Sequence, residues 1–118
     1  MEEKLYYYKA EVQSVYDGDA ITVDIDLGLS TWVRGEKIRL HRINAPELRG
    51  DEREVGLISR DYLRSLIDKK EIWLQTIKDK KGKYGRYLGE IWIEDSQNKW
   101  IKINDLLVEK GFAEYKDY

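Results

Sequence analysis

The 118-residue chain contains no cysteine, a single histidine, His41, and a single proline, Pro46. The lack of cysteine excludes disulfides, thiolate nucleophiles and cysteine-based zinc sites, and one histidine cannot build a histidine metal cluster. Carboxylates would therefore have to carry any metal chemistry.

The chain also lacks an excess of charge of either sign, because 21 Lys and Arg residues face 23 Asp and Glu residues. With a net charge of −2, the whole molecule does not attract nucleic acid or an anionic membrane. Any binding of phosphate must therefore depend on a local group of cations.

Long apolar runs are absent as well. No stretch approaches the run of about 18 apolar residues that spans a bilayer, and the opening MEEKLYYYKA lacks the basic and apolar segments of a secretion signal. We therefore expect neither export nor membrane insertion, and a cytoplasmic location by default. The length predicts one domain over residues 1–118.

The first third of the chain has the pattern of β-strands. Strands are predicted at Leu5–Val15, Ala20–Leu27 and Lys37–Ile43, where apolar residues are frequent or alternate with polar ones. The triplet Asp17-Gly18-Asp19 is typical of a hairpin turn, and Gly28–Gly35 of a loop. Short connections between these strands predict an antiparallel meander.

The periodicity changes to that of a helix after Pro46. Apolar residues recur at helical spacing between Val55 and Ile67 and predict an amphipathic helix over residues 52–68. Asp51 and Glu54 have the spacing of a capping box, with Asp51 as the N-cap.

The second half predicts two more strands and a second helix. The strands are Glu71–Ile77 and Arg86–Glu94, and a short helix over Asn104–Lys110 ends at Gly111. Five short strands with one helix between the third and fourth are the connectivity of an OB-fold barrel, a mainly β fold of the α+β class. Such barrels often bind oligonucleotides, but a fold alone does not establish a function.

Several polar segments stand out, and each has an ordinary structural explanation. Asp17-Gly18-Asp19 suits a hairpin turn, and Asn44-Ala45-Pro46-Glu47 suits a turn before a helix. Arg39 and Arg42 are an odd number of positions apart, so on a strand they point to opposite faces. The basic loop over residues 78–86 is typical of a solvated hairpin tip.

Taken together and in order, these segments resemble the signature of the staphylococcal (micrococcal) nuclease family, also called thermonuclease-like domains. That signature joins Asp-Gly-Asp-Thr, Arg-Leu, Asp-x-Pro-Glu, a helix, Lys-Tyr-Gly-Arg and a closing Asn-x-x-Leu-Val-x-x-Gly-x-Ala helix. The corresponding segments here are Asp17-Gly18-Asp19-Ala20, Arg39-Leu40, Asn44-Ala45-Pro46-Glu47, Lys83-Tyr84-Gly85-Arg86 and residues 104–113. The resemblance covers nearly the whole chain.

This resemblance implies an OB-fold enzyme, a calcium-dependent endonuclease that hydrolyses phosphodiester bonds of DNA and RNA without preference for the sugar. The expected substrate is mainly single-stranded, and we expect a monomer with no membrane partner. The implied calcium ligands are the side chains of Asp19 and Asn44 and the backbone carbonyl of Ala45.

The resemblance also implies the residues that act on the substrate. Arg39 and Arg86 match the two arginines that hold the phosphate, and Glu47 matches the glutamate that activates or orients the attacking water. Lys83 and Tyr84 match residues that hold the neighbouring phosphate of the strand.

Three positions depart from the family signature. Asn44 stands where the family has aspartate, Ala20 replaces threonine, and Gly82 replaces a common aspartate. Asn44 removes a negative charge, so calcium binding is expected to weaken, unless Asp17 or Asp24 compensates. The alternative function is therefore a catalytically weak or silent domain that binds nucleic acid or a protein partner. A small phosphorylated ligand held without hydrolysis is a third reading, with nothing specific in its favour.

Aromatic residues are further candidates for contact with bases. Trp32, Trp73, Trp92 and Trp100 have the chemistry to stack on bases. Trp73 and Trp92 lie within alternating strands, however, and this position favours a place in the core. Tyr115 lies after the closing helix, where the family places base-stacking tyrosines, although in a different register.

Overall fold

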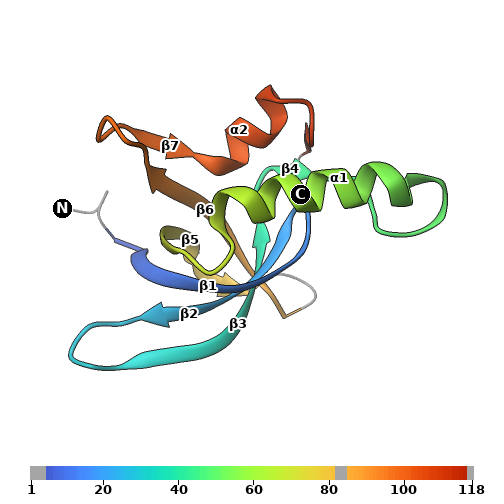
Figure 1. Ribbon diagram of the computed structural model, residues 1–118. Helices are drawn as coiled ribbons and strands as arrows, with labels where there is room; N and C mark the ends of the chain where they lie inside the picture. The colour runs from blue at the N-terminus through green and yellow to red at the C-terminus, as the bar shows by residue number, and fades with distance from the viewer. Residues whose placement is uncertain (1–4, 82–84, 117–118) are drawn as a thin grey trace.

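The computed structural model describes residues 5–81 and 85–116, and its centre is a β-barrel (Figure 1). The barrel strands are β1 (Tyr7–Asp17), β2 (Ala20–Asp26), β3 (Trp32–Leu40), β5 (Glu71–Lys81) and β6 (Tyr87–Glu94). Antiparallel pairing runs in the order β3-β2-β1-β5-β6, and a parallel pairing between β3 and β6 closes the barrel. The predicted five-stranded, OB-like α+β fold is confirmed.

The remaining elements cover or extend the barrel. They are β4 (Ile43–Asn44), η2 (Gly50–Glu52), α1 (Arg53–Ile67), β7 (Trp100–Lys102), α2 (Ile103–Glu109) and β8 (Glu114–Tyr115). The strand β7 continues the sheet beyond β6, while β4 and β8 form a separate two-stranded sheet. As predicted, α1 lies in the chain between the third and fourth barrel strands. No helix among the described residues has the length and apolar character that crossing a bilayer requires.

The core fills the barrel and the space beneath the helices. Alternation along β2 buries Ile21, Val23 and Ile25, and the stripe of α1 that faces the barrel buries Leu63 and Ile67. The side chains of these five residues leave at most 6% of their surface exposed. Their period of two in the strand and of four in the helix is the pattern that the sequence displays.

The predicted strand Lys37–Ile43 is wrong at both ends. It begins earlier, at Trp32, because Trp32 and Val33 in the predicted loop pair with Asp26 and Ile25 of β2. It ends at Leu40, because Arg42 takes a left-handed conformation with φ of 68°. This turn separates β3 from β4, so Arg39 and Arg42 diverge because the chain turns between them and not because a strand alternates.

The predicted capping box at Asp51 is also wrong. One turn of 3-10 helix, η2, precedes α1, and the N-cap of α1 is Glu52, which makes no side-chain capping bond. The carboxylate of Glu52 instead accepts a hydrogen bond of 2.9 Å from the backbone N–H of Glu47. The acidic residue at this helix start therefore fixes the preceding loop.

The end of α2 agrees with the predicted glycine cap. Gly111 has φ of 85°, and its N–H donates to the carbonyl of Val108. The N–H of Phe112 donates to the carbonyl of Leu107, which completes a Schellman motif. The chain then turns back into β8.

The prediction that Trp73 and Trp92 belong to the core is wrong. On β5 and β6 the core positions belong to Ile72, Leu74 and Ile91, each at most 1% exposed. Successive strand residues face opposite sides, so Trp73 and Trp92 lie half-buried on the outer face of the sheet.

Candidate active site

The hairpin turn after β1 lies directly against the loop between β4 and α1. A Cβ atom at Gly18 would lie 2.6 Å from Cβ of Ala45 and 3.0 Å from Cβ of Ser59 on α1. A Cβ atom at Gly56 would lie 2.2 Å from the carbonyl oxygen of Glu47. Only glycine permits these approaches, so the two glycines allow turn, loop and helix to pack together around Asp19.

Asp19 is the buried centre of this arrangement, with 6% of its surface exposed. Its Oδ2 accepts a hydrogen bond of 2.7 Å from the backbone N–H of Ala45 and lies 3.3 Å from Nη2 of Arg39. Its own N–H donates to Oδ1 of Asp17 across the hairpin turn. The β1–β2 turn, β3 and the loop after β4 therefore meet at one carboxylate.

Arg39 connects this carboxylate to Asn44. Its Nη2 donates to Oδ1 of Asn44 at 3.2 Å, and its Nη1 donates to the carbonyls of Leu40 and Ile43. The guanidinium is therefore held inside the fold, and the residue is 9% exposed. Asp19 Oδ2 and Asn44 Oδ1, which belong to the two side chains that the family resemblance implies as calcium ligands, both face the same cationic nitrogen.

The surroundings of Asp19 disfavour its negative charge. Burial raises the pKa of Asp19 to about 7, and hydrogen bonding and the negative charge of Asp17 act in the same direction. The N–H of Ala45 and the guanidinium of Arg39 partly oppose this shift in the pKa. A further cation close to Asp19 would favour the charged form of its carboxylate.

The donor chemistry at this point fits calcium. A carboxylate and an amide oxygen are both hard ligands that calcium accepts, and they already converge on a positive group. Within residues 5–81 and 85–116, no group of three or more His, Asp or Glu side chains is arranged to hold a metal. The backbone of Ala45 contacts Asp19 through its N–H, and the role of its carbonyl as a ligand stays a proposal.

Glu47 lies at the edge of this arrangement, on the exposed loop before η2. Its side chain is 63% exposed, and its Oε2 accepts a hydrogen bond of 3.0 Å from Nε of Arg49. Backbone contacts to Glu52 and to the surface of α1 at Gly56 fix the position of the loop. The carboxylate itself is accessible to solvent.

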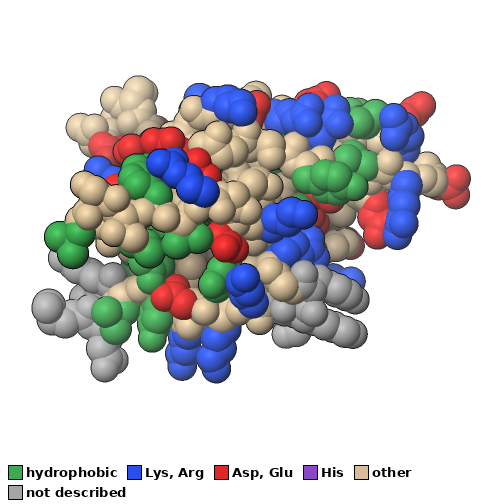
Figure 2. All heavy atoms as spheres, turned by 90° about the horizontal axis from the view of Figure 1, so that it is seen from below, with side chains coloured by type: hydrophobic (Ala, Val, Ile, Leu, Met, Phe, Trp, Pro, Cys, Tyr) green, Lys and Arg blue, Asp and Glu red, His purple; other side chains and the backbone are tan. Residues whose placement is uncertain are grey.

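Arg86 lines a basic groove between α1 and the β2–β3 hairpin, and the lining also includes Ala20, which follows Asp19, and Leu48, which follows Glu47. The groove has a volume of about 560 Å³, within the range of small-ligand pockets. Its cationic lining is Lys37, Arg60, Arg64 and Arg86. In the parallel pairing Ile38 lies opposite Tyr87, which places Lys37 and Arg86 in adjacent positions. Figure 2 shows Lys and Arg side chains around the end of the molecule where α1 begins.

Sequence reasoning missed the contribution of α1 to this groove. Arg60 and Arg64 are four residues apart, the spacing that places two side chains on the same helix face. Arg64 also donates to the carbonyl of Val15, which ties α1 to β1. The spacing was visible in the sequence, but the facing hairpin was not.

Other sequence candidates lie elsewhere. Lys83 and Tyr84, assigned to the neighbouring phosphate, lie outside the described residues. Asp24, considered as a compensating calcium ligand, instead accepts hydrogen bonds from Gln13, Arg34 and the N–H of Gly35. The carboxylate of Asp24 therefore binds groups of β1 and of the β2–β3 hairpin.

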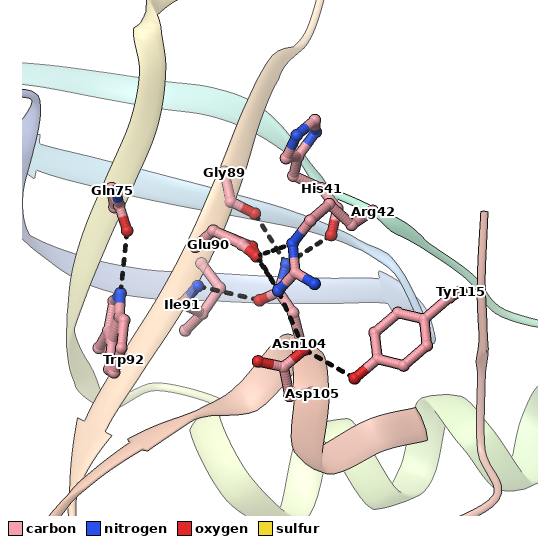
Figure 3. A network of polar contacts seen from close by, with 10 residues as sticks. All are labelled: His41, Arg42, Gln75, Gly89, Glu90, Ile91, Trp92, Asn104, Asp105 and Tyr115. Atoms are coloured by element: carbon pink, nitrogen blue, oxygen red, sulfur yellow. Dashed lines mark hydrogen bonds and ion pairs between the residues drawn. The ribbon is translucent and has the colours of Figure 1, made fainter. Parts of the chain in front are cut away.

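A second polar network holds the segment that carries Asn44 (Figure 3). Arg42 donates to Glu90 at 2.8 Å and to Asp105 at 3.0 Å, and the hydroxyl of Tyr115 donates to the same oxygen of Asp105. Tyr115 lies in β8, which pairs with β4, and its partner there is Ile43. The position of Asn44 therefore depends on contacts with α2 and β8.

Asn104 anchors α2 to the barrel within this network. Its side chain is fully buried, donates to the carbonyls of His41 and Gly89, and accepts from the N–H of Ile91. Each of the three bonds satisfies a backbone group at the end of β3 or in β6. The first residue of the closing Asn-x-x-Leu-Val segment is thus structural.

A comparison with known protein families shows which family the chain belongs to. The family model described as "Staphylococcal nuclease homologue" matches residues 37–118, more than half of the chain. The chain belongs to this family. The staphylococcal nuclease resemblance that the ordered segments carry is confirmed, and the family includes nucleases that typically use calcium.

Two relatives match most of the chain. A thermonuclease of Staphylococcus intermedius is 27% identical over 110 residues, which is 91% of this chain and 59% of the relative. The uncharacterized protein MJ1439 of Methanocaldococcus jannaschii is 31% identical over 128 residues, which is 91% of this chain and 58% of the relative. This member of the family thus spans less than two thirds of either relative.

Proposed function

We propose that this domain is a calcium-dependent endonuclease that hydrolyses phosphodiester bonds of single-stranded DNA and RNA. The observation that carries the proposal is the convergence of Asp19 Oδ2 and Asn44 Oδ1 on one cationic nitrogen of Arg39. This arrangement brings together two oxygen ligands and one phosphate-binding group from separate parts of the chain. Membership of the nuclease homologue family supports the same function.

The first requirement of this reaction is neutralisation of the phosphate. A phosphodiester is anionic and repels a nucleophile, so cations must bind its oxygens in the transition state. Arg39 and Arg86 are the proposed groups, since a guanidinium offers two parallel donors to a phosphate. Lys37, adjacent to Arg86, adds positive charge along the groove.

The second requirement is a base for the attacking water. Glu47 is the proposed group, because its carboxylate is exposed beside the loop that carries Ala45 and Pro46. Orienting a water molecule by a carboxylate does not require a strongly raised pKa. To reach the water, the carboxylate of Glu47 would turn away from Arg49, its present hydrogen-bond partner.

The third requirement is the metal. Asp19, Asn44 and the carbonyl of Ala45 are the proposed holders of calcium. When bound, the ion supplies positive charge beside the phosphate and increases the acidity of a coordinated water. For Asp19 and Asn44 to face an ion, Arg39 must give up its contacts with them, and a substrate phosphate provides the alternative partner for its guanidinium.

Nucleic-acid binding without efficient hydrolysis is the second candidate. Asn44 favours it, because a neutral amide replaces the carboxylate of the family signature and Arg39 already neutralises Asp19. In this reading Arg86 and the basic groove hold a strand, and the interior ion pair is purely structural.

Digestion of heat-denatured DNA and of RNA with calcium, and with excess chelator, tests the proposal. We expect degradation only with calcium. Glu47→Gln should lower the rate by about 10²–10⁴-fold while the fold stays intact. Glu54→Gln, an exposed change on the first turn of α1, is the matched control and should keep the wild-type rate. Equal rates for wild type and Glu47→Gln would remove Glu47 as the base, and no activity with calcium would leave the binding function.

A further inference from the structure

An ordered row of side chains crosses the outer face of four adjacent strands. Lys9 on β1 lies opposite Trp73 on β5, Trp73 lies opposite Trp92 on β6, and Trp92 lies opposite Lys102 on β7. These strands lie side by side in Figure 1. Residues directly opposite each other point to the same face, so two tryptophans lie together between two lysines.

Two more aromatic residues complete this face. Trp100 is 51% exposed and packs edge-on against Trp73, with 6.5 Å between the ring centroids. Together with Tyr7 these rings line a surface hollow of about 290 Å³, and we call the set Tyr7, Trp73, Trp92 and Trp100 the aromatic surface. It is distinct from the groove that Arg86 lines.

The positive charges on this face indicate which kind of ligand it would bind. Nζ of Lys9 lies 5.6 Å from the centroid of Trp73, and Nζ of Lys102 lies 4.8 Å from that of Trp92. The two lysines are three strand spacings apart, roughly 14 Å. A ligand with flat rings at its centre and negative charges toward both sides matches this row, and single-stranded nucleic acid has that composition.

The carboxylates near the aromatic surface define its limits. Glu90 lies on the same face but is paired with Arg42, so its charge is neutralised. Glu71 and Glu94 line the adjoining hollow beside Trp100, where they would repel a phosphate. Asp26 on β2 lies opposite Lys9 on the side away from Trp73, so it closes the row at that end. A strand would therefore follow the row from Lys9 to Lys102 and avoid both carboxylate edges.

The rings are fixed in place before a ligand binds. The indole N–H of Trp92 donates to Oε1 of Gln75 at 3.2 Å, and Figure 3 shows the two side chains pointing toward one another. Trp73 packs edge-on against Trp100 and lies opposite Trp92 in the strand register. Stacking on fixed rings costs little conformational entropy, because the side chains are already ordered.

We propose that the aromatic surface stacks the bases of a single-stranded nucleic acid, with Lys9 and Lys102 contacting its phosphates. The inference depends on the proposed function only for the class of ligand, and it concerns a second site outside the candidate active site. Such a site would hold a substrate strand away from the groove and lengthen its contact with the domain.

Binding of fluorescein-labelled dT12 in excess EDTA, followed by anisotropy, tests the proposal without cleavage. Trp100→Ala, at a half-exposed position, should weaken binding by roughly 5- to 100-fold, as stacking of one base on an aromatic ring requires. Lys9→Ala with Lys102→Ala should lower the slope of log affinity against log salt by about 1.4, because each contact with a single strand contributes about 0.7. Leu29→Ala, which removes a fully exposed apolar side chain from the loop between β2 and β3, is the control and should bind as wild type.

Several results would overturn the inference. In the first, Trp100→Ala and the double lysine variant keep the wild-type affinity and salt slope, while Arg86→Ala loses binding. This result would not contradict the proposed function. Another is competition by inorganic polyphosphate that is equally strong against wild type and Trp100→Ala, since only charge would then matter. A wild-type dimer in sedimentation that Trp100→Ala dissociates would show that a second copy covers the surface.

Loss of dT12 binding in Trp100→Ala combined with no cleavage by wild type would support the inference and contradict the nuclease function.

Discussion

The side-chain oxygens of Asp19 and Asn44 lie within 3.3 Å of one nitrogen, Nη2 of Arg39. The guanidinium therefore contacts both side chains that the family resemblance assigns to calcium. A positive ion and Arg39 cannot occupy the same place, so the charge at residue 44 decides how strongly an ion competes. This relationship connects the departure at Asn44 with the proposed chemistry.

Asn44→Asp should strengthen calcium binding by about tenfold or more. The added carboxylate restores a charged ligand beside Asp19, and removal of a charge from a metal site costs at least the roughly 10–100-fold that more distant changes cost. Calorimetry with calcium measures the affinity, and digestion at low calcium measures the activity. Unchanged affinity and activity would mean that the pair Asp19 and Asn44 does not hold the ion.

Arg86→Lys should lose most of the rate while keeping its charge. An ammonium cannot make the two parallel contacts of a guanidinium with a phosphate. Arg39→Lys should lose the rate as well, and it should also lower stability, because Arg39 makes four interior contacts. Single-turnover digestion and urea unfolding of both variants separate these effects. A fully active lysine variant at either position would exclude that arginine from phosphate binding.

Gly18→Ala should destabilise the fold by about 1–3 kcal/mol, the usual cost of overpacking. The new Cβ would lie 2.6 Å from that of Ala45, so the turn carrying Asp19 must move. Urea unfolding measures the loss. The double variant Gly18→Ala with Ala45→Gly removes that contact and should recover part of the stability. If the double variant is no more stable than Gly18→Ala, the new Cβ clashes with Ser59 instead.

Asp105→Asn should lower the stability by on the order of 1 kcal/mol near neutral pH, the contribution of a partly exposed charged hydrogen bond. Burial acts to raise the pKa of Asp105, but the hydrogen bonds from Tyr115 and Arg42 outweigh it and lower the pKa below its usual value. The unfolded chain therefore binds more protons, so this stability is present above the usual pKa of Asp and is lost as the pH falls through the lower folded value. Urea unfolding near pH 7 and pH 3 should show a clearly larger difference from wild type at pH 7 than at pH 3. A constant difference at both values would assign the loss to packing.

The sequence was sufficient to predict the barrel order, α1 and the glycine cap of α2, because these depend on local periodicity and on one backbone conformation. It also determined the family, because Asp17-Gly18-Asp19, Asn44-Ala45-Pro46-Glu47 and the segments after them occur in a fixed order. Local pattern sufficed where neighbours in the chain make the deciding contacts.

Only the tertiary structure decided which side chains meet. The contact of Arg39 with Asp19 and Asn44 joins three segments, and the positive φ at Arg42 that separates β3 from β4 has no local signal in a pattern of alternation. The outward position of Trp73 and Trp92 depends on which face of β5 and β6 the barrel encloses, and either face of these strands carries apolar residues. Alternation defines two faces of a strand, but packing against other strands selects the one that is buried.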